Sequence, residues 1–210
     1  MNGNDAMQKS RFVLDDLAPL IEHLASSHRV FQIEQDEDGQ VSWQASKSAD
    51  QPLIYGHEHL PLISPKKILF AEKEAMYRFD GETFETIQPD LSSQVLFGVH
   101  ACDLTAIAYQ DQFFRDDPYY QARRSKTLLV GIDCNAVCKT GFCPQVNAGP
   151  HVVSCTADII LSRISQDNKA NEANWLLSVE SQKGLYLLQG LALKVAGQTH
   201  IEARTQQLDS

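Results

Sequence analysis

The chain has 210 residues, of which 43% are hydrophobic and 21% are charged, and its formal net charge is −9. This composition is typical of one soluble globular domain, with or without a small appendage. The acidic balance argues against a nucleic-acid or anionic-membrane surface, because either would need clustered Lys and Arg. No apolar run approaches the roughly 20 residues that cross a bilayer, and the polar N-terminus lacks a signal-peptide core. We therefore expect a cytoplasmic protein without membrane insertion.

The N-terminal part of the chain is expected to contain a helix and two hairpins. Apolar residues recur at helical spacing from Arg11 to Ser26, which predicts an amphipathic helix with Pro19 inside it. The segments expected next, in chain order, are a β-hairpin with strands at 29–33 and 40–43, a loop to about Pro65, a strand at 67–70, a helical turn at 72–77 and a hairpin over 77–86.

The central part has the pattern of a strand, a helix and a second strand. Gln94–Val99 and Thr127–Ile132 are apolar runs, and Asp103–Phe114 between them has helical periodicity. This spacing predicts a βαβ unit with a right-handed crossover. Because the two strands show little polar alternation, we expect both of their faces to be buried.

The C-terminal part is expected to extend the same sheet. Strand-like runs lie at 158–164 and 175–179, a closing helix is expected over 181–195, and a polar, loosely packed tail follows. The sequence thus predicts an α/β fold with a mixed, partly parallel sheet, a central βαβ unit, flanking helices, and an N-terminal helix plus hairpin. We place one domain at 1–196 and a polar tail or linker at 197–210.

Four of the five cysteines follow the two central strands: Cys102 follows the first, and Cys134, Cys138 and Cys143 follow the second. The carboxyl ends of parallel strands share one edge of a sheet, where ligands commonly bind. Four thiolates match the ligand count of a [4Fe–4S] cluster or a structural zinc ion, so these residues are the candidate cofactor and metal ligands. The alternative is that the thiols are unligated, because cysteine is often a small buried hydrophobe.

Residues beside these cysteines have further possible roles. Asp103 is a plausible helix cap, and a helix N-terminus would lower the pKa of Cys102 and favour ligation or redox reactivity. His100 could ligate or donate to a cofactor, or could be an ordinary structural histidine. Cys155 lies in a strand-like run and is expected in the core.

The segment between the central helix and the second strand contains a pair of tyrosines and a pair of arginines. Tyr119, Tyr120, Arg123 and Arg124 could contact a flavin or a partner protein. The alternative is a loop whose tyrosines cover the sheet and whose Arg123 pairs with a neighbouring aspartate, 116 or 117. The common nucleotide-binding and zinc-protease motifs are absent from the sequence, and no residue is assigned a catalytic role.

Three stretches carry a resemblance to a known family. They are SPKKILF at 64–70 with FGVHACDLTAI at 97–107, DPYYQARR at 117–124, and the cysteine-rich stretch from Cys134 to Pro150. Together they resemble the β subunit of cytoplasmic sulfhydrogenases and the A subunit of anaerobic sulfite reductases. The resemblance runs from Arg11 to about Gly184. His100-Ala101 departs from it, because a basic residue and a proline are expected before Cys102.

The resemblance implies an electron-transfer role. In that family this domain precedes a dicluster ferredoxin domain that binds two [4Fe–4S] clusters and passes electrons between a flavin-bearing subunit and a catalytic subunit. The printed chain stops at Ser210, before any such run. We expect the N-terminal domain of an iron–sulfur subunit of a cytoplasmic hydrogenase or sulfite/sulfur reductase complex, not catalytic alone. The alternative is a cofactor-free docking scaffold that orients the ferredoxin domain and the partner subunits.

Overall fold

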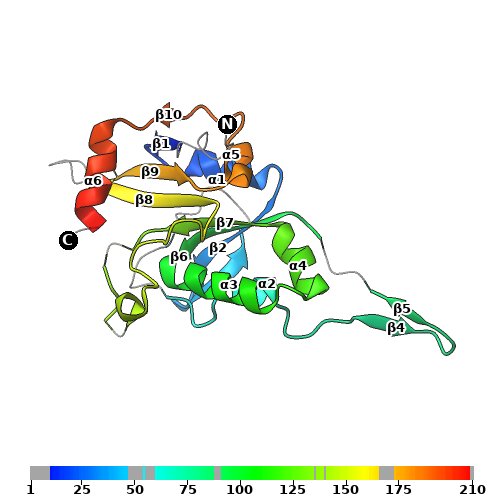
Figure 1. The fold of residues 1–210 in the computed structure, drawn as a ribbon. Helices are drawn as coiled ribbons and strands as arrows, with labels where there is room; N and C mark the ends of the chain where they lie inside the picture. Colours follow the sequence, from blue (N-terminus) through cyan, green and yellow to red (C-terminus); the bar gives the residue numbers. More distant parts are fainter. Residues whose placement is uncertain are drawn as a thin grey trace, which may run out of the picture.

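The computed structural model describes residues 10–46, 54, 60–87, 91–134, 136–139, 141–165 and 173–208 (Figure 1). The strands are β1 Arg11–Leu14, β2 Arg29–Gln35, β3 Val41–Ala45, β4 Tyr77–Phe79, β5 Phe84–Thr86, β6 Gln94–His100, β7 Thr127–Ile132, β8 Ile159–Ser165, β9 Ala173–Val179 and β10 Lys194–Val195. The helices are α1 Ala18–Ala25, α2 Lys66–Leu69, α3 Ala101–Phe113, α4 Pro118–Ser125, α5 Gln182–Leu187 and α6 Gln198–Leu208, with a 3₁₀ turn, η1, at Cys143–Val146.

One mixed sheet organises the fold. Its eight strands have the order β10-β1-β9-β8-β7-β6-β2-β3, and β4 and β5 form a separate hairpin. The neighbours β8, β7, β6 and β2 are parallel, whereas β3 at one edge and β9, β1 and β10 at the other are antiparallel. This confirms the predicted α/β class, the mixed, partly parallel sheet and its central βαβ unit, β6-α3-α4-β7.

Two hydrophobic cores lie on opposite faces of this sheet. Helices α1 and α5 cover one face, where they pack on side chains such as Val95, Phe97 and Val130. Helices α2, α3 and α4 cover the other face, over Leu96 and Leu129. The alternation along β6 and β7 explains why the two central strands are apolar throughout: both of their faces are buried, as the sequence predicts.

A bulge interrupts this alternation in β6. Phe97 pairs with Val130, and the next pair is Val99 with Gly131, so Gly98 is an extra residue in the strand. Gly98 has φ of 78°, a conformation that glycine adopts without a steric penalty. Beyond the bulge, Val99 packs in the second core, although strict alternation would place it with Phe97 in the first.

The helix predicted over 11–26 is wrong in its first part. Residues 11–14 form β1, which lies between β9 and β10 in the sheet, and only Ala18–Ala25 is helical. Pro19 lies in the first turn of α1, where its missing N–H would be unpaired in any case. Pairing with strands far along the sequence has overridden a local helical pattern.

Other predictions of secondary structure also need correction. Residues 66–69 form helix α2 instead of a strand, and 72–76 are irregular instead of helical. The closing helix ends at Leu187 and is followed by β10. The tail is not loosely packed: α6 contacts β8 and β9, beside which it lies in Figure 1. The hairpins β2-β3 and β4-β5 are confirmed.

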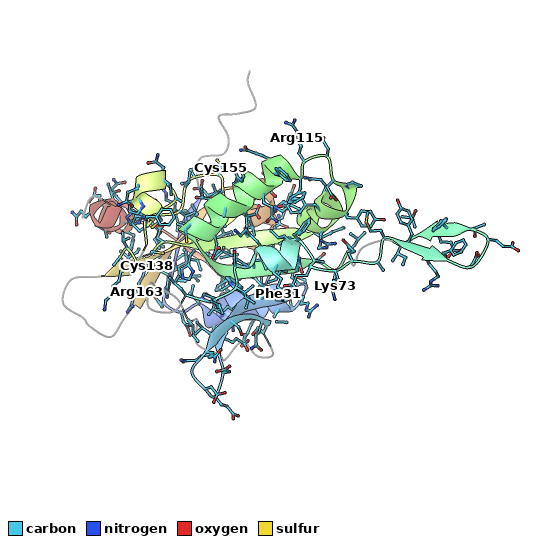
Figure 2. All side chains as sticks on the ribbon, turned by 90° about the horizontal axis from the view of Figure 1, so that it is seen from below. Phe31, Lys73, Arg115, Cys138, Cys155 and Arg163 are labelled. Atoms are coloured by element: carbon cyan, nitrogen blue, oxygen red, sulfur yellow. The ribbon has the colours of Figure 1, made fainter. Side chains whose placement is uncertain are left out.

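The β4-β5 hairpin projects from the body of the molecule (Figures 1 and 2). Phe79 and Phe84 stack on each other with ring centroids 4.7 Å apart, yet they remain 57% and 73% exposed. The base of the hairpin is fixed to the body, because the Tyr119 hydroxyl donates to the Met76 carbonyl at 3.3 Å and Arg123 pairs with Glu74. Among the described residues, no helix is both long and apolar enough to cross a membrane.

Candidate functional site

The carboxyl edge of the parallel strands carries the candidate site. His100, the last residue of β6, pairs with Ile132, the last residue of β7. Cys102 and Cys134 therefore each lie two residues beyond the same pair, at the same level of the sheet edge. The bulge at Gly98 sets this alignment, since without the extra residue the end of β6 would be shifted by one position relative to β7.

The connection after β7 folds back on this edge. The backbone N–H of Cys134 donates to the Pro150 carbonyl at 3.0 Å, and the N–H of Ala148 donates to the Cys143 carbonyl at 2.8 Å. Gly149 suits this turn because its φ is +151°, a backbone conformation that other residues rarely adopt. The loop thus brings its cysteines toward the start of α3, as predicted from the strand order.

The four thiols are electrostatically coupled. Burial, followed by charge on Cys102 and then on Cys138 and Cys143, raises the pKa of Cys134 to about 12. Burial, followed by the Asp103 carboxylate, also raises the pKa of Cys102. Cys134 is thus coupled to the other three predicted cysteines, and the protein environment disfavours the thiolate forms of Cys102 and Cys134.

The expected lowering of the Cys102 pKa by the helix N-terminus is wrong. The helix cap is His100, and Asp103 lies within the first turn, where it accepts a hydrogen bond from the Ser64 hydroxyl at 2.6 Å. The start of α3 does act on the sulfurs, because the backbone N–H of Ala101 donates to Cys134 and that of Asp103 to Cys102. Both bonds favour thiolates, but burial outweighs them.

Four cysteines are the ligand type that zinc ions and iron–sulfur clusters take, but their sulfurs do not define one binding geometry. Among the residues that the structure describes, no three His, Cys, Asp or Glu side chains form a metal-binding group. A zinc ion needs four sulfurs about 2.3 Å from one point. A [4Fe–4S] cluster takes one cysteine at each of its irons, so its ligands lie farther apart.

A buried carboxylate holds the loop next to Cys134. Asp133 is 7% exposed and accepts hydrogen bonds from the Val152 backbone N–H at 2.8 Å and the Ser162 hydroxyl at 2.6 Å. The Arg204 guanidinium pairs with the same carboxylate at 3.0 Å. Sequence reasoning missed these residues because Arg204 lies in the segment expected to be a tail. The sequence feature that could have indicated this site is the position of Asp133 directly after a fully apolar strand.

His100 is buried, whereas Cys155 is exposed. His100 is 1% exposed, neither ring nitrogen has a hydrogen-bond partner among the described residues, and burial lowers its pKa while Asp103 opposes the shift. The expectation that Cys155 lies in the core is wrong. Its side chain is exposed and its φ of 68° places it in a turn before β8.

The tyrosine pair has one buried and one exposed member. Asp117 caps α4, accepting from the backbone N–H groups of Tyr119 and Tyr120 at 2.9 Å. Tyr120 is 1% exposed, and its hydroxyl donates to Asp111 at 2.6 Å. Burial and this bond raise its pKa. Tyr120 is therefore removed from any partner surface, whereas Tyr119 lies at the base of the projecting hairpin.

The two arginines of α4 hold neighbouring segments together. Arg124 pairs with Asp111 at 3.0 Å, and Arg123 pairs with Glu74 and donates to the Leu69 carbonyl at 2.8 Å. The expected pairing of Arg123 with an adjacent aspartate is wrong. Both guanidinium groups have partners within the chain, so their availability to another protein stays a prediction.

Comparison with known proteins supports the resemblance seen in the sequence. No family model matches the chain. The chain is similar to sulfhydrogenase 2 subunit beta from Pyrococcus furiosus. The two are 29% identical over 126 residues, which are 59% of this chain and 34% of the relative. The chain thus spans about a third of the relative's length, and the similarity is to a subunit of a hydrogenase.

Proposed function

We propose that this chain is the N-terminal domain of an iron–sulfur electron-transfer subunit of a cytoplasmic hydrogenase or sulfite/sulfur reductase complex. The observation that carries the proposal is the alignment of Cys102 and Cys134 at one level of the sheet edge, with Cys138 and Cys143 as electrostatic neighbours. The similarity to a sulfhydrogenase β subunit supports the same class of complex.

A [4Fe–4S] cluster would be held by Cys102, Cys134, Cys138 and Cys143, and a zinc ion is the alternative. A bound cluster supplies reversible one-electron transfer. The chain's own residues leave Cys102 exposed and half-bury the other three cysteines, donate the Ala101 and Asp103 N–H groups to sulfur, and anchor the cysteine loop through Asp133. Loading must displace protons from the thiols, so it is favoured by rising pH.

The chain would act with other subunits and not as a complete enzyme. A flavin-bearing subunit and a catalytic subunit are the proposed partners, and two further [4Fe–4S] clusters are proposed for a C-terminal domain outside this chain. The chemistry of hydrogen, sulfur or sulfite would then take place in the partner subunits.

Anaerobic reconstitution with iron and sulfide tests the cluster. We expect a brown protein that contains about four irons per chain, and we expect Cys102→Ser to lose most of that iron. Cys155→Ser is the matched control, because Cys155 is exposed in a turn and should leave the iron content unchanged. A colourless protein with neither iron nor zinc would contradict the proposal.

A second candidate function is a docking scaffold without a cofactor. One observation favours it: the β4-β5 hairpin exposes its aromatic rings to solvent. The scaffold requires that partner assembly survive replacement of all four cysteines by serine. Loss of both iron and assembly in that variant would support the cluster function instead.

A further inference from the structure

A second feature suited to a ligand lies away from the cysteines. A cavity of about 470 Å³ opens between the β2-β3 hairpin, α2 and α4, on the face of the sheet that carries the second core. Three of its lining residues, Arg29, Lys67 and Arg123, are cations, and none of the described residues that line it is acidic. On a chain with a net charge of −9, this is a local reversal of charge that suits an anion.

Aromatic rings line the same cavity. Phe31 on β2 and Trp43 on β3 project from one face of the hairpin and pack against the second core. Figure 2 shows Phe31 close to α2. The indole nitrogen of Trp43 is buried and has no hydrogen-bond partner among the described residues. A buried N–H donor without a partner is unusual and suits a ligand that brings an acceptor.

The cations differ in how firmly they are held. Arg123 is committed to Glu74 and the Leu69 carbonyl. Lys67 pairs with Glu72 at 3.0 Å, but both side chains are at least half exposed, so the pair is weak. Arg29 stacks over Phe31, 4.8 Å from the ring centroid, and has no carboxylate partner within the described part of the chain. Arg29 is the cation most available to an anionic ligand.

We propose that this cavity binds a nucleoside phosphate. The base would lie against Phe31 and Trp43, where the indole N–H can donate to a base acceptor, and the phosphate would contact Arg29 and Lys67. An apolar molecule would leave the cations unused, and inorganic phosphate would leave the aromatic rings unused. The volume lies within the range of about 300–1,000 Å³ typical of small-molecule sites.

This site is independent of a metal at the cysteines. Ser64 connects the two regions, because it lines the cavity and its hydroxyl donates to Asp103 at the start of α3. None of the residues proposed to touch the nucleotide is a candidate thiol ligand. Binding is therefore expected in metal-free and in reconstituted protein alike, so failure of one proposal leaves the other standing.

Isothermal titration calorimetry of the 210-residue chain tests the site. The probes are AMP, GMP, UMP and FMN, with the phosphate-free form of each (adenosine, guanosine, uridine and riboflavin) and inorganic phosphate as the half-ligands. We expect at least one nucleotide to bind with a Kd below about 1 mM, and each half-ligand of that nucleotide to bind at least about tenfold more weakly. Saturable fluorescence change that disappears in Trp43→Phe would place the binding at this cavity, because the other tryptophan, Trp175, belongs to the first core.

Arg29→Gln should weaken nucleotide binding about tenfold or more, because a charge-assisted hydrogen bond to phosphate is lost. Arg29 is exposed at the start of β2, so this variant should fold normally. Arg115→Gln is the matched control, since Arg115 lies in the turn after α3, does not line the cavity, and is drawn far from Phe31 in Figure 2. Absence of nucleotide binding, equal binding of phosphate alone, or equal effects of the two variants would overturn the proposal.

Discussion

A single buried carboxylate links the cysteine loop to the C-terminal helix. Asp133 receives three partners from three segments: the Val152 N–H, the Ser162 hydroxyl and the Arg204 guanidinium. Removing the arginine leaves a buried charge with fewer donors, which is more costly than losing an exposed pair. The residue before Cys134 is thereby fixed by a helix about seventy positions away in sequence.

We expect Arg204→Ala to lower the free energy of unfolding by about 1–3 kcal/mol in urea denaturation at neutral pH. Lys194→Ala is a matched control, because Lys194 and Asp15 form a pair that is more than 70% exposed on both sides. The control should change stability by less than about 0.5 kcal/mol. Equal effects of the two variants would show that burial of Asp133 does not matter.

The cysteine positions could be predicted from the sequence, but the environment of each thiol could not. Apolar runs ending shortly before Cys102 and Cys134 indicate strand ends, and parallel strands place their ends together. The pKa of Cys102 depends on its partial desolvation and on the Asp103 carboxylate, which no local pattern specifies. Cys155 was expected in the core, yet its left-handed backbone places it in an exposed turn.

At the scale of elements, local periodicity failed where long-range pairing decided the structure. Residues 11–14 have apolar residues at helical spacing, but β9 and β10 both pair with them, which a helix could not satisfy. The central βαβ unit was predictable because its strands are apolar on both faces and its helix is bounded by them. Helix α6 was missed because its sequence is polar and its packing involves few large apolar residues.

The β4-β5 hairpin is expected to contribute little to the stability of the body. Its aromatic rings contact each other and solvent, and an isolated two-stranded hairpin is marginal in water. Replacing Tyr77–Thr86 by two glycines would keep the hydrogen bond of 2.9 Å from the Ile87 N–H to the Met76 carbonyl at the hairpin base. We expect the free energy of unfolding to change by less than about 1 kcal/mol.

Truncation of β3 provides the contrast for that measurement. The β2-β3 hairpin places Trp43 against the second core, so its loss would expose apolar surface and destabilise the chain strongly. If the β4-β5 replacement instead destabilised the protein as much as loss of β3, the projecting hairpin would have to pack on the body in solution.

At the scale of the whole molecule, one sheet separates two cores that share every central strand. Alternate residues of β6 and β7 belong to opposite cores, so neither core can loosen without disturbing the other. The N-terminal β1 closes the same sheet between β9 and β10, which come from the C-terminal part of the chain. Cooperative unfolding of the body is the expected consequence.

Two single-tryptophan variants test this cooperativity. Trp43→Phe leaves Trp175 to report on the first core, and Trp175→Phe leaves Trp43 to report on the second. Urea unfolding followed by fluorescence should give, within each variant, the same midpoint as far-UV circular dichroism. A fluorescence midpoint that departs from the circular dichroism midpoint in either variant would show that the two cores unfold independently.

Gly98 has a consequence for how the edge of the sheet is specified. β6 has seven residues where β7 has six, because Gly98 is an extra residue. The bulge therefore reverses which residues of β6 face each side of the sheet. Odd-numbered residues before Gly98 face the first core, whereas Val99 after it faces the second. The relative position of two thiols that follow different strands, Cys102 and Cys134, is therefore set by a residue that has no side chain. A substitution there must either strain the backbone or move α3 by one position against β7.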